Sequence, residues 1–201
     1  MPDSLPPQAS LTIAGAQREM RHAYLAGAPG MLVSGTVWFV AGCVCLLQTP
    51  QRAVWALFIG GMLIHPLSVV LLKLLGRPGG HTPGNPLGTL ALATTFWMIL
   101  SLPLAYAASL VRSEWFFPAM LLVIGGRYLT FSTIYGTRLY WACGAVLAAA
   151  AWVLAASNAA PALGAFSGAA IEAVFGIALL VAERGRARQQ STCQAPDIGA
   201  R

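Results

Sequence analysis

The sequence predicts an all-α, polytopic membrane protein, a helical bundle with six transmembrane helices and an N-terminal amphipathic helix. Composition is the first reason, because 57% of the 201 residues are hydrophobic and only 9% are charged, whereas soluble domains contain about 25% charged residues. The second reason is that the apolar residues form six runs long enough to cross ~30 Å of hydrocarbon at ~1.5 Å per helical residue. The third is that the alternating polar and apolar pattern of a membrane β-barrel is absent.

The six runs also begin with residues that favour helix starts. Asn85 and Pro86 suit an N-cap and the first helical position, and three further runs have a proline in their first turn. A proline is tolerated there because the first backbone N–H groups of a helix have no partner within the helix. The predicted spans are Pro29–Leu47, Ala53–Leu75, Pro86–Leu110, Phe116–Gly136, Leu139–Ser157 and Pro161–Ala182.

The chain outside these spans is polar, which divides it into three parts. Residues 1–28 form an N-terminal cytoplasmic segment, residues 29–182 the transmembrane domain, and residues 183–201 a basic cytoplasmic tail that we expect to be disordered. Within the first part, Met1–Ala9 is rich in proline and is also predicted to be disordered. Ser10–Leu25 has apolar residues at helical spacing and basic residues elsewhere on the wheel, which predicts an amphipathic helix at the membrane interface.

Lysine and arginine residues give the orientation, because cytoplasmic loops of membrane proteins are enriched in both. With six spans, nine of the twelve basic residues lie on the side that holds both termini and two lie on the other side. We therefore expect both termini in the cytoplasm and the protein in a bacterial inner membrane. The nine are Arg18, Arg21, Lys73, Arg77, Arg138, Arg184, Arg186, Arg188 and Arg201, and the two are Arg52 and Arg112.

Ionisable residues inside the spans mark the place where function is expected, because a charge at the bilayer centre costs roughly 2.5–3.5 kcal/mol or more. Arg127, Glu172 and His65 each lie twelve residues into spans that run in the same direction, which places them at one depth, about 18 Å along each helix. Because intramembrane charges usually face inward and pair, we expect a salt bridge between Arg127 and Glu172. The candidate polar site comprises Arg127, Glu172, His65, Tyr128, Thr130 and Thr133.

Two classes of function remain open for this site. A small-solute or ion pathway would have a cavity that reaches Arg127, with Thr130 and Thr133 along a cytoplasmic entry. A non-catalytic structural or regulatory subunit would bury the same residues, and the Arg127–Glu172 salt bridge would only fix how the helices pack. Catalysis is less favoured, because the motifs H-E-x-x-H and G-x-S-x-G are absent. No catalytic residue, metal site or cofactor is predicted.

The net charge of +6 raises the question of nucleic acid, but the basic residues gather in short loops and in the tail. That distribution is typical of membrane orientation rather than of a nucleic-acid surface. The expected partners are therefore the lipid bilayer, a small polar or anionic solute, and further copies of the chain in a homo-oligomer, with no nucleic acid.

The fourth span contains a pattern G-x-x-Y-L-x-F-x-x-x-Y-G, formed by Gly125, Tyr128, Leu129, Phe131, Tyr135 and Gly136. With this pattern the chain resembles an uncharacterised family of small, six-span bacterial membrane proteins, over about Arg21 to Ala182. The resemblance implies six spans and no assigned activity. Family members often have histidine where this chain has Arg127, so the resemblance does not extend to a shared protonation role at that position.

Overall fold

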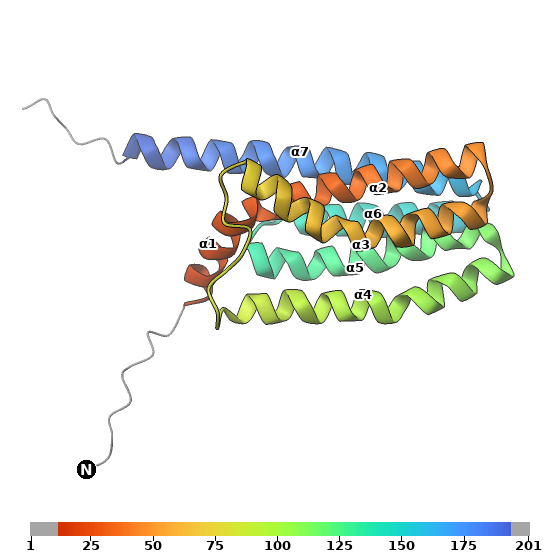
Figure 1. The fold of residues 1–201 in the computed structure, drawn as a ribbon, viewed down its shortest axis with the longest axis horizontal. Coiled ribbons are helices and arrows are strands. Elements are labelled where there is room, and N and C mark those ends of the chain that lie inside the picture. Colours follow the sequence, from red (N-terminus) through yellow and green to blue (C-terminus); the bar gives the residue numbers. More distant parts are fainter. Residues whose placement is uncertain (1–11, 194–201) are drawn as a thin grey trace, which may run out of the picture.

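The structure is a computed structural model that describes residues 12–193, and this part of the chain is helical from end to end apart from short connections (Figure 1). Six of its helical segments are long and apolar enough to cross a membrane. The predicted disordered segment Met1–Ala9 and residues 194–201 of the predicted tail lie outside the described residues. The helices are α1 (Ile13–Tyr24), α2 (Ala28–Leu47), α3 (Pro50–Leu74), α4 (Pro86–Val111), α5 (Phe116–Tyr135), α6 (Leu139–Ala156) and α7 (Pro161–Cys193), with short 3-10 turns η1 (Leu25–Gly27) and η2 (Ser113–Trp115).

Side-chain caps account for several helix boundaries. The predicted N-cap at Asn85 is confirmed, since its side chain accepts a hydrogen bond of 3.0 Å from the backbone N–H of Leu87 in α4. Thr49 caps α3 in the same way, which is why this helix begins at Pro50, before the predicted start of the span. At its C-terminal end α5 stops at Gly136, which has φ +61°. Helix α7 continues past the predicted end of the sixth span and runs to Cys193.

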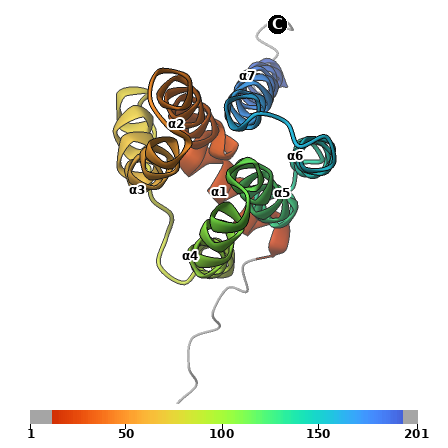
Figure 2. The ribbon, with the colours of Figure 1, turned by 90° about the vertical axis from the view of Figure 1, so that its right-hand side faces the viewer.

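The long helices form two groups that meet at α7. Helix α2 packs on α3 and α7, while α5 packs on α4 and α6, and α7 also contacts α5 and α6. Viewed along the bundle, α3 and α4 lie at the periphery, each against its own neighbour (Figure 2). Although α3 and α4 are consecutive in the sequence, they pack mainly on α2 and α5 rather than on each other.

Glycine residues allow the closest helix pairs to approach. On α5 and α6, Gly125 and Gly144 face each other, and a Cβ atom added to Gly144 would lie 2.7 Å from the carbonyl oxygen of Gly125. Between α2 and α7, a Cβ atom on Gly35 would lie 3.3 Å from the carbonyl oxygen of Ala169. Small residues at such contacts let helix backbones pack closely within a membrane. Gly126, the neighbour of Gly125, instead faces open space.

We predict that Gly144→Ala destabilises the protein by about 1–3 kcal/mol, because the added methyl group meets the backbone carbonyl oxygen of Gly125, which cannot rotate away, and the side chain of Leu129. Gly126→Ala is the matched control, since nothing lies within 4 Å of its added Cβ atom and alanine is the better helix former by about 0.5–1 kcal/mol. Thermal unfolding in detergent measures both. Equal stability of the two variants would contradict this account of α5–α6 packing.

Helix α1 lies across one end of the bundle, and its apolar face is buried there (Figures 1 and 2). The buried residues of α1 are Ala16, Met20 and Ala23, which recur at the helical spacing seen in the sequence. The opposite face, with Arg18 and His22, is exposed. We call this end of the molecule the α1 end.

Polar side chains attach α1 to the helix ends and to the loop beside it. Gln17 donates a hydrogen bond of 2.7 Å to the carbonyl oxygen of Thr133, and Arg21 donates one of 2.5 Å to that of Tyr135. These carbonyls lie in the last turn of α5, where they have no partner within the helix. Glu19 accepts from the backbone N–H of Thr82 at 2.5 Å, and hydrogen bonds from Thr82 lower the pKa of its carboxyl. Asn85 Nδ2 also donates to Glu19, at 2.9 Å.

The junction between α1 and α2 has an unusual backbone. Leu25, Ala26 and Gly27 all have positive φ, at 48°, 51° and 79°. Glycine adopts this left-handed conformation readily, but for the other two residues it costs roughly 1–2 kcal/mol each. Tyr140 on α6 holds the junction in place, since its hydroxyl donates a hydrogen bond of 2.7 Å to the carbonyl oxygen of Ala26. Both Tyr140 and Ala26 are fully buried.

Candidate functional site

Glu172 on α7 is the most deeply buried charged residue of the predicted site, with 0% of its surface exposed. The hydroxyl of Tyr128 on α5 donates a hydrogen bond of 2.8 Å to its Oε1 atom. The buried side chain of Ser34 on α2 also lies near the carboxyl, but Oε2 has no hydrogen-bond partner. A carboxyl group therefore lies where α2, α5 and α7 meet, and one of its two oxygens has no hydrogen-bond partner.

Arg127 points in a different direction, toward α4. Its Nη2 atom donates a hydrogen bond of 3.0 Å to the hydroxyl of Thr95, and its Nη1 atom lies 3.4 Å from the sulfur of Met98. The guanidinium carbon lies 5.0 Å from the centre of the Phe131 ring, which provides a cation–π contact. Its Nε atom is buried without a hydrogen-bond partner.

The predicted salt bridge between Arg127 and Glu172 is wrong for this structure, since within the described residues no ion pair joins these two side chains. The reason is rotation about the helix axis. Arg127 and Tyr128 are adjacent on α5, and adjacent helical residues point about 100° apart. Because Tyr128 faces Glu172, Arg127 must face α4. Equal depth along two helices does not bring two side chains together unless both helices are also rotated to face each other.

The remaining predicted site residues are dispersed. His65 lies on the exposed face of α3, away from the Tyr128–Glu172 pair. The Thr130 hydroxyl donates a hydrogen bond of 2.7 Å to the carbonyl oxygen of Arg127, so it is used within α5. Thr133 is exposed, and its backbone carbonyl accepts from Gln17. Of the six predicted residues, the structure brings only Tyr128 and Glu172 into direct side-chain contact with each other.

An aromatic cluster lies between this pair and the α1 end, and the sequence analysis missed one of its four members, Tyr140. Its members are Tyr128, Phe131, Tyr135 and Tyr140, whose neighbouring ring centres lie 5.5 to 5.8 Å apart. The spacing of Tyr128, Phe131 and Tyr135 places these three on one face of α5, and Tyr140 reaches them from α6. Thr95 was also missed, although a threonine pair within an apolar run indicates a polar contact.

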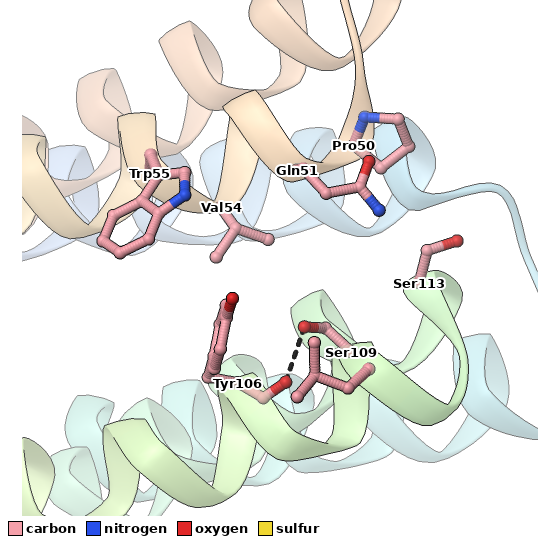
Figure 3. Close-up of a pocket in the computed structure, with 8 residues that line it drawn as sticks. Pro50, Gln51, Val54, Trp55, Tyr106, Ser109 and Ser113 are labelled. Atoms are coloured by element: carbon pink, nitrogen blue, oxygen red, sulfur yellow. Dashed lines mark hydrogen bonds between the residues drawn. The ribbon is translucent and has the colours of Figure 1, made fainter.

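Two hollows are described, and neither is lined by Arg127 or Glu172. The first, of about 40 Å³, lies at the end of the bundle opposite α1, between α3 and the C-terminal part of α4 (Figure 3). Gln51, Tyr106, Ser109 and Ser113 give it polar walls. The second is an apolar groove of about 530 Å³ along α2 and α7, lined by Leu32, Gly35, Thr36, Phe39, Phe166, Ala169, Ala170 and Ala173.

The chemistry available at Glu172 is that of a weak acid in an apolar enclosure. An ionised carboxylate without a cation costs several kcal/mol to bury, and no cationic side chain pairs with Glu172 among the described residues. The carboxyl can remain neutral by holding a proton. In the part of the chain that the structure describes, no three His, Cys, Asp or Glu side chains are grouped to hold a metal ion.

Six helical segments that are long and apolar enough to cross a membrane, with a buried carboxyl among them, define the class of protein as an all-α helical bundle. Residues 13–182 match a family of unknown function, DUF7010, and the chain belongs to this family. The match agrees with the uncharacterised family expected from the pattern in α5. Comparison with curated proteins and with solved structures gives no match.

We predict that double-mutant cycles will show coupling at Tyr128–Glu172 and much less at Arg127–Glu172. Tyr128→Phe with Glu172→Met should give a coupling energy of about 1 kcal/mol, because the hydrogen bond is lost in either single variant. Arg127→Met with Glu172→Gln should be additive within about 0.5 kcal/mol, because the two residues share no hydrogen-bond partner. The free energy of unfolding in detergent is the measurement. The reverse order of coupling would contradict the arrangement described here.

Proposed function

We propose that the chain is an integral protein of a bacterial inner membrane, with both termini and the α1 end on the cytoplasmic side. The support is the charge distribution, since basic residues gather at the α1 end, where α1, the start of α4 and the last turns of α3, α5 and α7 lie. Thermodynamics supports membrane insertion as well. Large apolar side chains such as Met62, Leu100 and Trp152 are at least 74% exposed, which is favourable in lipid and unfavourable in water.

Reporter fusions test this topology. A reporter placed after Ala160, between α6 and α7, should report the outer side, whereas one placed after Gln189, in the C-terminal part of α7, should report the cytoplasm. The expected result is opposite activity of a cytoplasmic and a periplasmic reporter at the two positions. The same activity at both positions would contradict a sixth span between them.

We infer that the bundle provides a pathway for a small ion or solute, with Glu172 as its central binding group. The observation that carries this proposal is the burial of Glu172, which is 0% exposed, has one unpaired oxygen and has no cationic partner. Intramembrane carboxyl groups of this kind are typical of proton and ion pathways. A proton fits the enclosure best, because Glu172 is 0% exposed and a proton is the smallest species that the carboxyl can bind.

The proposed mechanism is exchange of a proton at Glu172 as access alternates between the two sides. In the closed conformation the proton keeps the carboxyl neutral, and Tyr128 orients it through Oε1. When water or a polar solute reaches Oε2, the carboxyl group gives its proton to that molecule. The carboxylate that results is then stabilised by solvation. Arg127 has one unused donor, Nε, and in this scheme it attracts an anionic solute on the α4 side of α5.

Proton flux into vesicles tests the role of Glu172. The purified protein is reconstituted in phosphatidylethanolamine–phosphatidylglycerol vesicles that contain a pH-sensitive dye, and a potassium diffusion potential drives protons inward. Wild-type protein should acidify the lumen, and Glu172→Gln should reduce the flux to that of protein-free vesicles, because the amide binds no exchangeable proton. Tyr128→Phe should reduce it partly.

His65→Gln is the matched control for the flux measurement. It also replaces an ionisable residue in a membrane-length helix, but on an exposed face, so its flux should equal that of the wild type. Wild-type flux in Glu172→Gln would contradict the proposal.

A structural role is the second candidate, and one observation favours it. The Tyr128–Glu172 hydrogen bond joins α5 to α7, helices from the two groups of the bundle, so it fixes their relative depth and rotation. A purely structural or regulatory subunit, alone or as a homo-oligomer, would lose stability in Glu172→Met, which removes the hydrogen bond. The wild-type protein would then show no proton flux.

A further inference from the structure

We propose that α1 is a hinged lid, closed in this structure, which opens by moving its apolar face from the bundle onto an anionic membrane surface. The partner is the headgroup layer of anionic phospholipids. This inference concerns the α1 end and does not depend on the role of Glu172. It rests on three observations: the polar latch of α1, the strained junction that connects α1 to α2, and the composition of α1 itself.

The latch consists of a few polar contacts around a small apolar face. Gln17 and Arg21 donate to the final carbonyls of α5, and Glu19 accepts from the loop that precedes α4. Tyr24 and His81 share a further hydrogen bond of 2.9 Å. Three of these contacts lie at the exposed rim of α1, where water can replace them. The lid is therefore held by contacts that can be exchanged without disturbing the helices of the bundle.

The junction gives the lid a hinge. Leu25, Ala26 and Gly27 are consecutive left-handed residues, and the first two adopt this conformation at a steric cost. Such strain persists only where the surrounding structure maintains it, and here the Tyr140 hydroxyl holds the carbonyl of Ala26. Release of that single hydrogen bond allows two residues to return to favoured backbone angles. The strain therefore favours opening, while the latch favours the closed position.

The composition of α1 suits a membrane surface in the open position. Ile13 is already 71% exposed, and it lies on the same helical face as the buried Ala16, Met20 and Ala23. Arg18 and His22 occupy the opposite face, which is the arrangement of an interfacial helix that binds anionic lipid.

The closed position is also unfavourable for one of the cations of α1. Burial lowers the pKa of the Arg21 guanidinium, and the positive charge of Arg186 on α7 lowers it further, while Glu183 opposes this effect. Moving α1 toward anionic headgroups replaces a neighbouring cation with negative charge. Anionic lipid should therefore increase the open population.

Distances between spin labels test the lid directly. In a variant in which the four cysteines are replaced by alanine, labels are attached to Ala14→Cys on α1 and Arg138→Cys between α5 and α6, both exposed positions. The distance between the two labels is then measured by pulsed electron–electron double resonance in phosphatidylcholine vesicles, with and without phosphatidylglycerol. We expect one short distance in neutral vesicles and a second, longer distance in anionic vesicles.

Three substitutions should change the fraction of molecules in which α1 is open. Gln17→Ala should increase it by roughly 2- to 10-fold, because one latch hydrogen bond is lost. Ala26→Gly should decrease it by roughly fivefold or more, because glycine relieves the steric cost of the closed hinge. Arg18→Gln should decrease it only in anionic vesicles, because Arg18 faces away from the bundle.

A second pair of labels, at Gln48→Cys and Ser157→Cys near the opposite end of the bundle, provides the control. Its distance should be the same in every variant and lipid, which shows that the bundle is intact. One unchanged α1 distance in all variants and both lipids, with the control pair unchanged, would overturn the proposal and make α1 a fixed cap. A longer distance that appears equally in neutral vesicles would overturn the choice of anionic lipid as the partner.

Discussion

The structure depends on the hydrogen bond between Tyr128 and Glu172, because it is the place where the two groups of helices share a buried polar contact. A carboxyl group with no exposed surface is costly in an apolar bundle. The hydrogen bond restricts the rotation of α5 and α7 relative to each other. The glycine contacts of α5 with α6 and of α2 with α7 follow from the same requirement, since close backbones leave little space around the carboxyl.

The α1 end and the polar site are related through the aromatic cluster of α5 and α6. Tyr140 contacts Tyr128, which binds Glu172, and it also holds the carbonyl of Ala26 at the junction of α1 and α2. A movement of α1 would therefore reach α6 through one hydrogen bond and the site through one ring contact. This chain of contacts gives the proposed lid a physical connection to the proposed pathway.

The number of the long helices and most of their first residues were predictable from the sequence because apolar runs, prolines and caps are local properties. The depth of Arg127 and Glu172 was predictable for the same reason, since it requires only counting along a helix. Their pairing was not, because it depends on how each helix is rotated, and rotation is set by packing at Gly125, Gly144 and Gly35. The amphipathic pattern of α1 predicted a helix at the membrane interface, whereas in the structure its apolar face packs on the bundle. The pattern shows which face is apolar but carries no information on what covers that face.

The central claim, that Glu172 holds an exchangeable proton, is tested most directly by infrared difference spectroscopy of the reconstituted protein in H2O and D2O. The account predicts a carbonyl band of a protonated carboxylic acid that shifts on deuteration, changes with Tyr128→Phe and disappears with Glu172→Gln. A spectrum in which Glu172→Gln removes only the bands of an ionised carboxylate, at every pH at which the protein is folded, would contradict the claim.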